Sequence, residues 1–283
     1  MPCVKKNIIW LASYPKSGNT WFRIFLQNLF SDSEEPKNIN HLQFAPIASS
    51  RLIFDKYLGV NSSDLTNDEI ENLRPEVYRM ISAQNESFVF LKTHDAWILN
   101  NNGNPLFPEE ITRGVIYFIR NPLDIAVSFA FHDNNNFEKT ISKMNDLRFG
   151  FCLNNSKLRN QIPQHLLSWS KHVISWVHRS NLPVYVMRYE NMIEEPEETF
   201  SKALEFLNIE YTESKLSLAL QNSSFEKLSK QEKEYGFIEK KICTKKFFRS
   251  GTRNNWRIHL KNSHIKQIIK FNRNIMKEFG YLT

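Results

Sequence analysis

A strand, a tight loop and a helix within one continuous stretch constrain this chain most. The stretch runs from Ile8 to Phe30 and reads IIWLASYPKSGNTWFRIFLQNLF. Its first residues are apolar and β-prone, which predicts a short buried strand. Pro15 to Gly18 then interrupt the pattern, and from Thr20 onward apolar residues recur at helical spacing. The chain is therefore expected to pass from a buried strand into a helix through a very short loop.

This loop is expected to bind a dianionic group such as phosphate or sulfate. It carries Lys16 and Gly18, together with the hydroxyl or amide side chains of Ser17, Asn19 and Thr20. Unpaired backbone N–H groups and the helix dipole place partial positive charge at the start of a helix, and Lys16 adds a full charge. The Walker A pattern G-x-x-x-x-G-K-[ST] is absent, because the lysine precedes the glycine. The alternatives are a related phosphate cradle and a strand-to-helix turn with a chance lysine.

The rest of the chain predicts an α/β fold. Three more segments have the pattern of buried strands: Ser87–Lys92, Gly114–Arg120 and Val184–Arg188. Helices are expected at 66–82, 122–132, 165–180, 195–207, 223–230 and 265–279. Strands that alternate with helices indicate a mostly parallel central sheet flanked by helices. With no repeat and no linker between two cores, we predict a single domain over residues 1–283, with mobile segments at about 133–161 and 231–246.

Charge and cysteine content limit the class of partner and the compartment. The net charge of +7 suits a polyanionic ligand, and it would also suit nucleic acid or an anionic membrane. Cys3, Cys152 and Cys243 are too far apart for a metal motif and form no disulfide framework. No stretch has the pattern of a secretory leader or a membrane span. The expectation is a soluble, cytoplasmic protein.

Polar residues follow the predicted strands at the point where each strand ends. They are Lys16, His94, Arg120 and Tyr189. A parallel sheet would bring these positions to one edge, where ligands bind in such folds. His94 is suited to take a proton from an attacking hydroxyl, and Lys92 precedes it by two residues; the alternative is a histidine that only caps its strand.

A second phosphate site is suggested by two later segments. Arg120 and Ser128 offer a guanidinium and a hydroxyl, although an arginine often pairs with a surface carboxylate instead. In the block from Phe248 to Arg257, Gly251 permits close backbone approach to a ligand, and Arg249 adds a charge.

Blocks from Tyr14 to Arg257 resemble, in the same order, those of sulfotransferases that use 3′-phosphoadenosine 5′-phosphosulfate (PAPS). The blocks are YPKSGNTW at 14–21, KTH at 92–94, FIRNPLDIAVSFAFH at 118–132, RYENM at 188–192, NSSFEKL at 222–228 and FRSGTRNNWR at 248–257. The resemblance implies a P-loop-like fold and transfer of a sulfonate group from PAPS to a hydroxyl of a small-molecule acceptor. It also implies adenosine 3′,5′-bisphosphate as the product and no requirement for a metal.

The resemblance assigns roles to individual residues. His94 would be the general base, with Lys16 and Lys92 as further catalytic residues. Donor binding is implied for Lys16, Ser17, Gly18, Asn19, Thr20, Trp21, Arg120, Ser128, Tyr189, Ser223, Phe225, Arg249, Ser250 and Gly251. Within this set, Trp21 and Phe225 are candidates for stacking on the adenine, or for ordinary core packing.

The last block departs from the family pattern R-K-G…G-x-W-K. Ser250 stands where lysine is usual, an asparagine replaces the second glycine, and Arg257 replaces the final lysine. Arg253 is a candidate substitute for the missing basic contact. The family's dimer motif is not visible around Lys261, so the choice between monomer and homodimer stays open.

Two other function classes remain as alternatives. A kinase would need Mg²⁺ ligands and a Walker-type loop, and neither is evident. A non-catalytic module for polyanions would fit the charge, but nucleic acid is not expected, because the key cations lie at strand ends rather than along a face. The acceptor stays open among carbohydrates, lipids, phenols and peptides.

Overall fold

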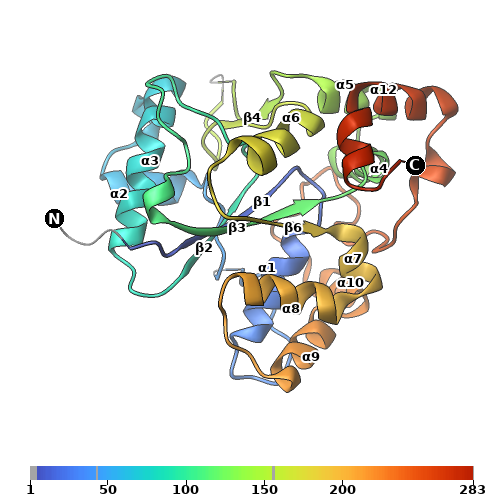
Figure 1. Ribbon diagram of the computed structural model, residues 1–283, viewed down its shortest axis with the longest axis horizontal. Coiled ribbons are helices and arrows are strands. Elements are labelled where there is room, and N and C mark those ends of the chain that lie inside the picture. Colours follow the sequence, from blue (N-terminus) through green and yellow to red (C-terminus); the bar gives the residue numbers. More distant parts are fainter. Residues whose placement is uncertain (1–4, 43, 155–156, 283) are drawn as a thin grey trace. The chain divides into compact units, whose positions relative to one another are not determined.

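The structure, a computed structural model, describes residues 5–42, 44–154 and 157–282 (Figure 1). Its packing divides the chain into two compact units, each assembled from three stretches of sequence. Unit 1 comprises Met1–Tyr14, Ala45–Tyr117 and Asp146–Val186. Unit 2 comprises Pro15–Phe44, Phe118–Asn145 and Met187–Thr283. The single domain over residues 1–283 stays a prediction.

A four-stranded sheet has the strand order β2-β1-β3-β6. Its strands are β1 (Ile8–Ser13), β2 (Val89–Thr93), β3 (Thr112–Ile119) and β6 (Val184–Arg188). β1 and β2 pair in parallel, with a register that runs from Ile8 opposite Val89 to Ala12 opposite Thr93. Each predicted strand is found within two residues of its expected ends. The α/β class with a central parallel sheet is confirmed.

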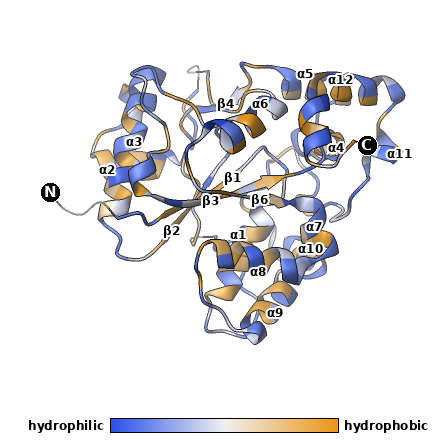
Figure 2. Ribbon diagram, in the orientation of Figure 1, coloured by the Kyte–Doolittle hydropathy of each residue, from blue (hydrophilic) through white to orange (hydrophobic). Residues whose placement is uncertain are grey.

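The middle strands are the most apolar part of the sheet because parallel strands are covered on both faces. Every residue of β1 is buried, and in β3 only Arg113 is not fully buried. Figure 2 shows β3 in the orange of hydrophobic residues over much of its length. Trp10 of β1 packs edge-on against the rings of Tyr78 and Phe107, at 4.9 and 4.8 Å between centroids. These aromatic contacts form part of the core of unit 1.

The helices of unit 1 come from its second and third stretches. Its other elements are α2 (Arg51–Leu58), η1 (Ser62–Asp64), α3 (Asn67–Ala83), η2 (Glu109–Ile111), β4 (Gly150–Phe151), β5 (Gln164–His165), α6 (Trp169–Ile174) and the π-helical turn η3 (Ser175–Arg179). Thr66 caps α3, and its exchange of hydrogen bonds with Glu69 forms a capping box. The helix predicted at 165–180 begins later, at Trp169, because His165 pairs within β5 and Ser168 caps α6.

Unit 2 is mostly helical. Its helices are α1 (Asn19–Leu29), α4 (Pro122–Asp133), α5 (Phe137–Asn145), α7 (Tyr189–Glu194), α8 (Pro196–Phe206), α9 (Glu213–Asn222), α10 (Phe225–Tyr235), α11 (Trp256–His259) and α12 (Asn262–Glu278). Phe22 and Phe25 of α1 pack on Phe200 of α8, with ring centroids 5.5 and 4.6 Å away. This aromatic packing fixes α1, and with it the end of the loop at Gly18, within unit 2.

The two segments predicted to be mobile, about 133–161 and 231–246, contain helix. α5 lies within 133–161 and buries Thr140, Ile141 and Met144, a helical face that the surrounding asparagines obscure in the sequence. α10 continues to Tyr235, five residues beyond its predicted end. Helix α9 was not predicted at all.

None of the helices in the described part of the chain combines the length and apolar composition that a membrane span needs. Cys152 and Cys243 form no disulfide within the described residues, and Cys3 lies outside them.

Candidate functional site

The loop before α1 has an unusual backbone at two positions. Lys16 and Gly18 have φ angles of 73° and 104°, in the region that favours glycine. A Cβ on Gly18 would lie 2.9 Å from Cδ2 of Tyr189 and 3.2 Å from Sδ of Met192. Glycine is therefore required here for two reasons, its backbone angle and the close approach of α7.

The start of α1 presents polar groups without a capping side chain. Gly18 is the N-cap, no side chain caps the helix, and no acidic residue lies in its first turn. Asn19 and Thr20 are buried. The side chain of Ser17 is only 1% exposed, and its Oγ has no hydrogen-bond partner among the described residues. A buried hydroxyl without a partner is costly, so an anion that accepts its hydrogen would stabilise the loop.

The Lys16 ammonium lies in an aromatic and basic setting within unit 2. Its Nζ is 4.2 Å from the ring centroid of Phe247 and 3.5 Å from Nδ1 of His132. The rings of His132 and Phe247 pack edge-to-face at 5.8 Å. Neither residue was predicted as part of the site: His132 is the last residue of the 118–132 block and Phe247 directly precedes the 248–257 block, but both lie far from Lys16 in the sequence.

Arg120 connects three segments of unit 2. Its Nη1 donates to the backbone oxygen of Lys16 at 3.0 Å, and its Nη2 donates to that of Thr252 at 3.3 Å. The guanidinium also lies 4.0 Å from the ring centroid of Tyr189, and its buried Nε has no hydrogen-bond partner in the described part of the chain. Arg120 therefore brings together the loop, α7 and the 248–257 block.

Arg249 adds a second guanidinium to this group. It stacks over Phe131 of α4 at 4.4 Å from the ring centroid. Burial lowers the pKa of Arg249, and the positive charge of Arg120 lowers it further, partly opposed by Asp124. Two arginines that repel one another favour an anion between or beside them.

The 248–257 block is held in place by α10 and α4. Gly251 has φ 61°, and a Cβ there would lie 2.4 Å from Cδ2 of Phe225. The Asp124 carboxylate accepts from the backbone N–H groups of Asn254 and Trp256 at 2.8 and 3.1 Å. Sequence reasoning missed this role of Asp124, although it lies within the FIRNPLDIAVSFAFH block.

Several predicted donor residues have other contacts in the structure. Ser250 bonds to Thr252 and Asn255 within its own loop. Ser223 Oγ donates to the backbone oxygen of Ala219 at 2.6 Å, so it is bound to its own helix. Arg253, the candidate substitute for the missing basic contact, forms an ion pair with Glu194.

The two candidate adenine-stacking residues differ in exposure. Trp21 packs edge-on against Tyr189 and Phe200, at 6.3 and 5.5 Å between ring centroids, which is a packing role. Phe225 is 36% exposed at the start of α10. Ser128 is half-buried on α4. Phe225 therefore has the more accessible ring for stacking.

Unit 1 holds the other predicted catalytic residues, Lys92 and His94. Lys92 lies on β2, where its backbone N–H donates to Pro46 and its carbonyl accepts from Ala48. His94 follows the strand, and its ring lies edge-on to Phe151 at 6.5 Å. His94 Nδ1 is 2.8 Å from the backbone oxygen of Ser13.

This last contact determines the tautomer of His94. A carbonyl oxygen can only accept a hydrogen bond, so Nδ1 carries the hydrogen and the neutral ring has its lone pair on Nε2. The parallel register puts Thr93 opposite Ala12, which brings the next residue, His94, beside Ser13. The ring therefore presents Nε2 as the basic nitrogen.

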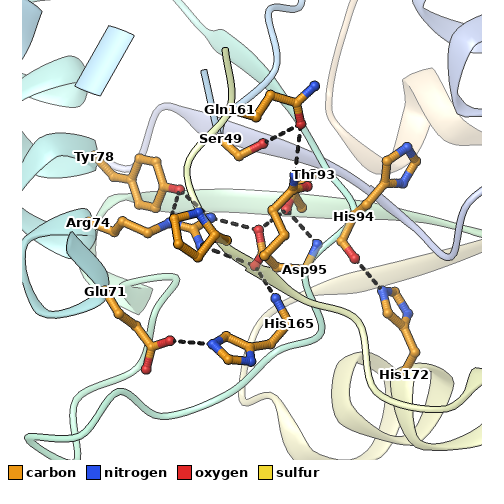
Figure 3. A network of polar contacts seen from close by, with 12 residues as sticks. Ser49, Glu71, Arg74, Tyr78, Thr93, His94, Asp95, Gln161, His165 and His172 are labelled. Carbon is orange, nitrogen blue, oxygen red and sulfur yellow. Dashed lines mark hydrogen bonds and ion pairs between the residues drawn. The ribbon is translucent and has the colours of Figure 1, made fainter. Parts of the chain in front are cut away.

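A buried polar network holds the backbone around His94 (Figure 3). Arg74 of α3 binds the Asp95 carboxylate with two hydrogen bonds, of 3.1 and 2.6 Å. The same carboxylate accepts from the hydroxyl of Thr93 at 3.2 Å and from the backbone N–H of His165 at 3.0 Å. Side chains from separate parts of unit 1 thus converge on one turn of backbone.

Comparison with known proteins places the chain in a family. The family model described as "Sulfotransferase domain" matches residues 6–280. The chain belongs to the sulfotransferase family. The predicted resemblance is confirmed, and so is the expectation of a sulfotransferase enzyme.

Curated relatives are similar over most of their length. Luciferin sulfotransferase of Photinus pyralis is 26% identical over 90% of this chain and 67% of its own. Sulfotransferase 2A6 of Rattus norvegicus is 26% identical over 90% of this chain and 80% of its own.

Solved structures share the fold of this sulfotransferase. Mouse sulfotransferase SULT7A1 complexed with PAP matches with a TM-score of 0.59 at 18% identity, over 96% of this chain and 85% of its own. Retinol dehydratase in a complex with retinol and PAP matches with a TM-score of 0.63 at 18% identity, over 96% of this chain and 82% of its own.

The predicted site of this sulfotransferase divides between the two units. Unit 2 contains all of the predicted donor-binding residues, while Lys92 and His94 belong to unit 1. No group of three or more His, Cys, Asp or Glu that could hold a metal ion occurs among the residues that the structure describes.

Proposed function

We propose that this sulfotransferase transfers the sulfonate group of PAPS to a hydroxyl of a small-molecule acceptor, with His94 as the general base. The observation that carries the proposal is the contact of Arg120 with both the Lys16 loop and the 248–257 block. It joins within unit 2 the two segments that are candidates for binding the two separate anionic ends of such a donor.

The residues of unit 2 fit such a donor. The Lys16 ammonium, the uncapped start of α1 and the buried hydroxyl of Ser17 suit the 5′-phosphosulfate. Arg249 suits the 3′-phosphate, since the nearby positive charge of Arg120 would be compensated by that phosphate. Phe225, exposed at the start of α10, suits the adenine face.

PAPS would supply an activated sulfonate and a phosphate leaving group. His94 Nε2 would take the proton of the acceptor hydroxyl as its oxygen forms a bond to sulfur and the bond from sulfur to the phosphate oxygen breaks. Lys16, Thr20 and the loop N–H groups would stabilise the negative charge left on that phosphate oxygen, each such donor contributing about 3 kcal/mol. Lys92 would neutralise the sulfonate oxygens. None of these roles needs a metal.

The acceptor is proposed to be a small alcohol or phenol with an apolar body. Similar proteins include a luciferin sulfotransferase and a retinol dehydratase bound to retinol. The ring of Phe151 beside His94 would contact the apolar part of such a molecule. We also propose a cytoplasmic location, on the charge and cysteine usage of the chain.

The test of the proposal is sulfonate transfer from radiolabelled PAPS to a mixed library of alcohols and phenols, with the product masses measured. The wild type should label an acceptor, and His94→Asn should lower kcat about 100- to 10,000-fold while its affinity for adenosine 3′,5′-bisphosphate stays within about twofold. Near wild-type turnover of His94→Asn would exclude the base assignment.

Donor binding is tested separately by calorimetry with adenosine 3′,5′-bisphosphate. Arg249→Ala should weaken binding about 10- to 100-fold, because a charge-assisted contact to phosphate is lost. Arg273→Ala, an exposed arginine on α12, is the matched control and should bind as the wild type does. Equal affinities for all three proteins would place the donor elsewhere.

A further inference from the structure

A second histidine lies directly behind His94 in unit 1. His172 of α6 has no exposed surface, and its Nε2 lies 3.1 Å from the backbone oxygen of His94 (Figure 3). Its Nδ1 lies 2.8 Å from the hydroxyl of Tyr117. No motif in the sequence pointed to His172, which is separated from His94 by 78 residues.

We propose that His172 is a positioning residue for the general base: it holds the backbone of His94 so that Nε2 of the catalytic ring is aimed at the acceptor hydroxyl. The inference rests on the proposed role of His94 as base. His172 itself would touch neither donor nor acceptor, since it acts through the carbonyl of His94.

The hydrogen-bond directions along this chain of contacts follow from the partners. The carbonyl oxygen of His94 can only accept, so His172 carries its hydrogen on Nε2. In the neutral ring, Nδ1 of His172 then accepts, and Tyr117 must donate its hydroxyl hydrogen to it. The His94 carbonyl therefore sets the tautomer of His172, and the Tyr117 hydroxyl satisfies its second ring nitrogen.

Burial keeps His172 in this neutral form. It lowers the pKa of His172 to about 4, against the opposing effects of the His94 and Asp95 carbonyls and of the Asp95 charge. The ring also packs edge-on against Tyr14 and tilted against Tyr117, at 5.5 and 5.7 Å between centroids. An imidazole so enclosed has one protonation state and one orientation at neutral pH.

The backbone carbonyl of Asp95, the residue after His94, is also held by a side chain from the segment that carries His172. Trp176 Nε1 donates to the backbone oxygen of Asp95 at 2.9 Å. Residues at i and i+4 share one face of a helix, so His172 and Trp176 clamp two successive carbonyls. With Arg74 on the Asp95 carboxylate, the turn that carries the base is fixed on both sides of its backbone.

With its backbone fixed, the His94 ring is further restrained by the bond from Nδ1 to the Ser13 carbonyl and by the edge-on contact with Phe151. Reacting groups must lie within a few tenths of an ångström of the productive geometry, and a shift of about 1 Å can cost about 100-fold in rate. Loss of the His172 contact should therefore lower kcat without weakening donor binding.

The experiment is a double-mutant cycle between His172→Phe and His94→Asn, with PAPS as donor and the acceptor found in the transfer screen. His172→Phe keeps a ring of similar size but removes the N–H donor. We expect it to lower kcat about 10- to 100-fold and to leave KM for PAPS within about threefold. In the His94→Asn background the same change should alter the residual kcat by less than about threefold, because there is no base left to position.

Two further variants separate positioning from general stability. His172→Gln retains a side-chain N–H donor and should recover a large part of the lost kcat. Ser82→Ala is the matched control: it removes a buried hydroxyl that bonds to Asn7 at 2.6 Å and to the Lys5 carbonyl at 3.0 Å, ahead of the first residue of β1. Its kcat should stay within about twofold of the wild type despite a lower stability. If His172→Phe does not fold, Tyr117→Phe takes its place in the cycle.

The outcomes distinguish failure of the positioning role of His172 from failure of the proposed sulfotransferase function. A wild type that does not use PAPS, or a His94→Asn variant with normal kcat, would overturn the proposed function. If the wild type uses PAPS and His94→Asn lowers kcat as expected, the positioning role can still fail. An equal loss of kcat from His172→Phe with and without His94 would overturn it. An unchanged kcat in His172→Phe would overturn it as well.

Discussion

Left-handed backbone at Lys16 and Gly18 shapes the loop before α1 at the scale of single residues. Lysine seldom adopts a φ of 73°, so the loop holds it there at a cost in free energy. Such strain is common at binding sites, where contacts with the ligand or the surrounding fold compensate for it. The close approach of Tyr189 to Gly18 is part of that surrounding fold.

Gly18→Ala should lower the free energy of unfolding by about 2–4 kcal/mol and abolish tight binding of adenosine 3′,5′-bisphosphate. The reason is both the φ of 104° and the contact of the new Cβ with Tyr189 at 2.9 Å. Urea unfolding and calorimetry measure the two effects. Gly59→Ala is the control, since Gly59 has φ 69° but no atom within 4 Å of its Cβ position. If both variants lose equal stability, the steric contact has no effect.

The burial of His172 predicts a pH dependence of stability. Its pKa falls from 6.5 to about 4 on folding, so between these values the unfolded chain binds a proton that the folded chain does not. The stability linked to this histidine is complete above pH 6.5 and is lost as the pH falls toward 4, by roughly 3 kcal/mol in total.

Urea unfolding of the wild type and His172→Phe between pH 7.5 and 4.5 tests this. The free energy of unfolding of the wild type should fall more steeply with decreasing pH. His165, whose pKa is raised by its bond to Glu71 against the effect of burial, is present in both proteins and cancels in the comparison. Parallel curves would mean that His172 takes up its proton equally well in the folded state.

At the scale of elements, the ion pair of Arg74 and Asp95 connects α3 to the end of β2. The side chains are 1% and 0% exposed, and the pair also bonds to Tyr78, Thr93 and the backbone at Pro163 and His165. A buried pair of this kind adds little stability over an apolar contact, but removal of one partner leaves the other as an uncompensated charge.

Arg74→Met should therefore lower the free energy of unfolding by about 3–5 kcal/mol. Arg74→Met combined with Asp95→Asn should cost clearly less than the sum of the two single changes, because no lone charge remains. Arg79→Met, on the same helix, is the matched control. Its guanidinium pairs with Glu76 and Glu110 in a half-exposed position, so its loss should cost less than about 1 kcal/mol. Additive single effects would contradict the coupling of Arg74 and Asp95.

At the scale of the whole molecule, the proposed donor contacts all lie in unit 2, although they come from three separate stretches of sequence. Adenosine 3′,5′-bisphosphate at about 100 times its Kd should stabilise the protein by about 2.7 kcal/mol. Hydrogen exchange should show which segments the ligand protects. Slower exchange is expected in residues 15–30, 118–132 and 247–257. Protection limited to unit 1 would contradict the donor site.

Local patterns in the sequence were enough to predict the strands, most helices and the strand–loop–helix unit. They work because alternation and helical spacing of apolar residues are set by the nearest few neighbours in the chain. The motif order predicted the family, which the comparisons confirmed. The helices α5 and α9 were not predicted from the sequence, because their buried faces are short and interrupted by polar residues.

The sequence by itself thus determined the strands, most of the helices, the family and the candidate residues of the loop before α1. Only the tertiary structure decided which of those residues meet: Arg120 with the loop, Arg249 near Arg120, Arg74 with Asp95 and His172 behind His94. The physical reason is that a hydrogen bond or ion pair between residues far apart in the chain leaves no periodic trace in the sequence around either one.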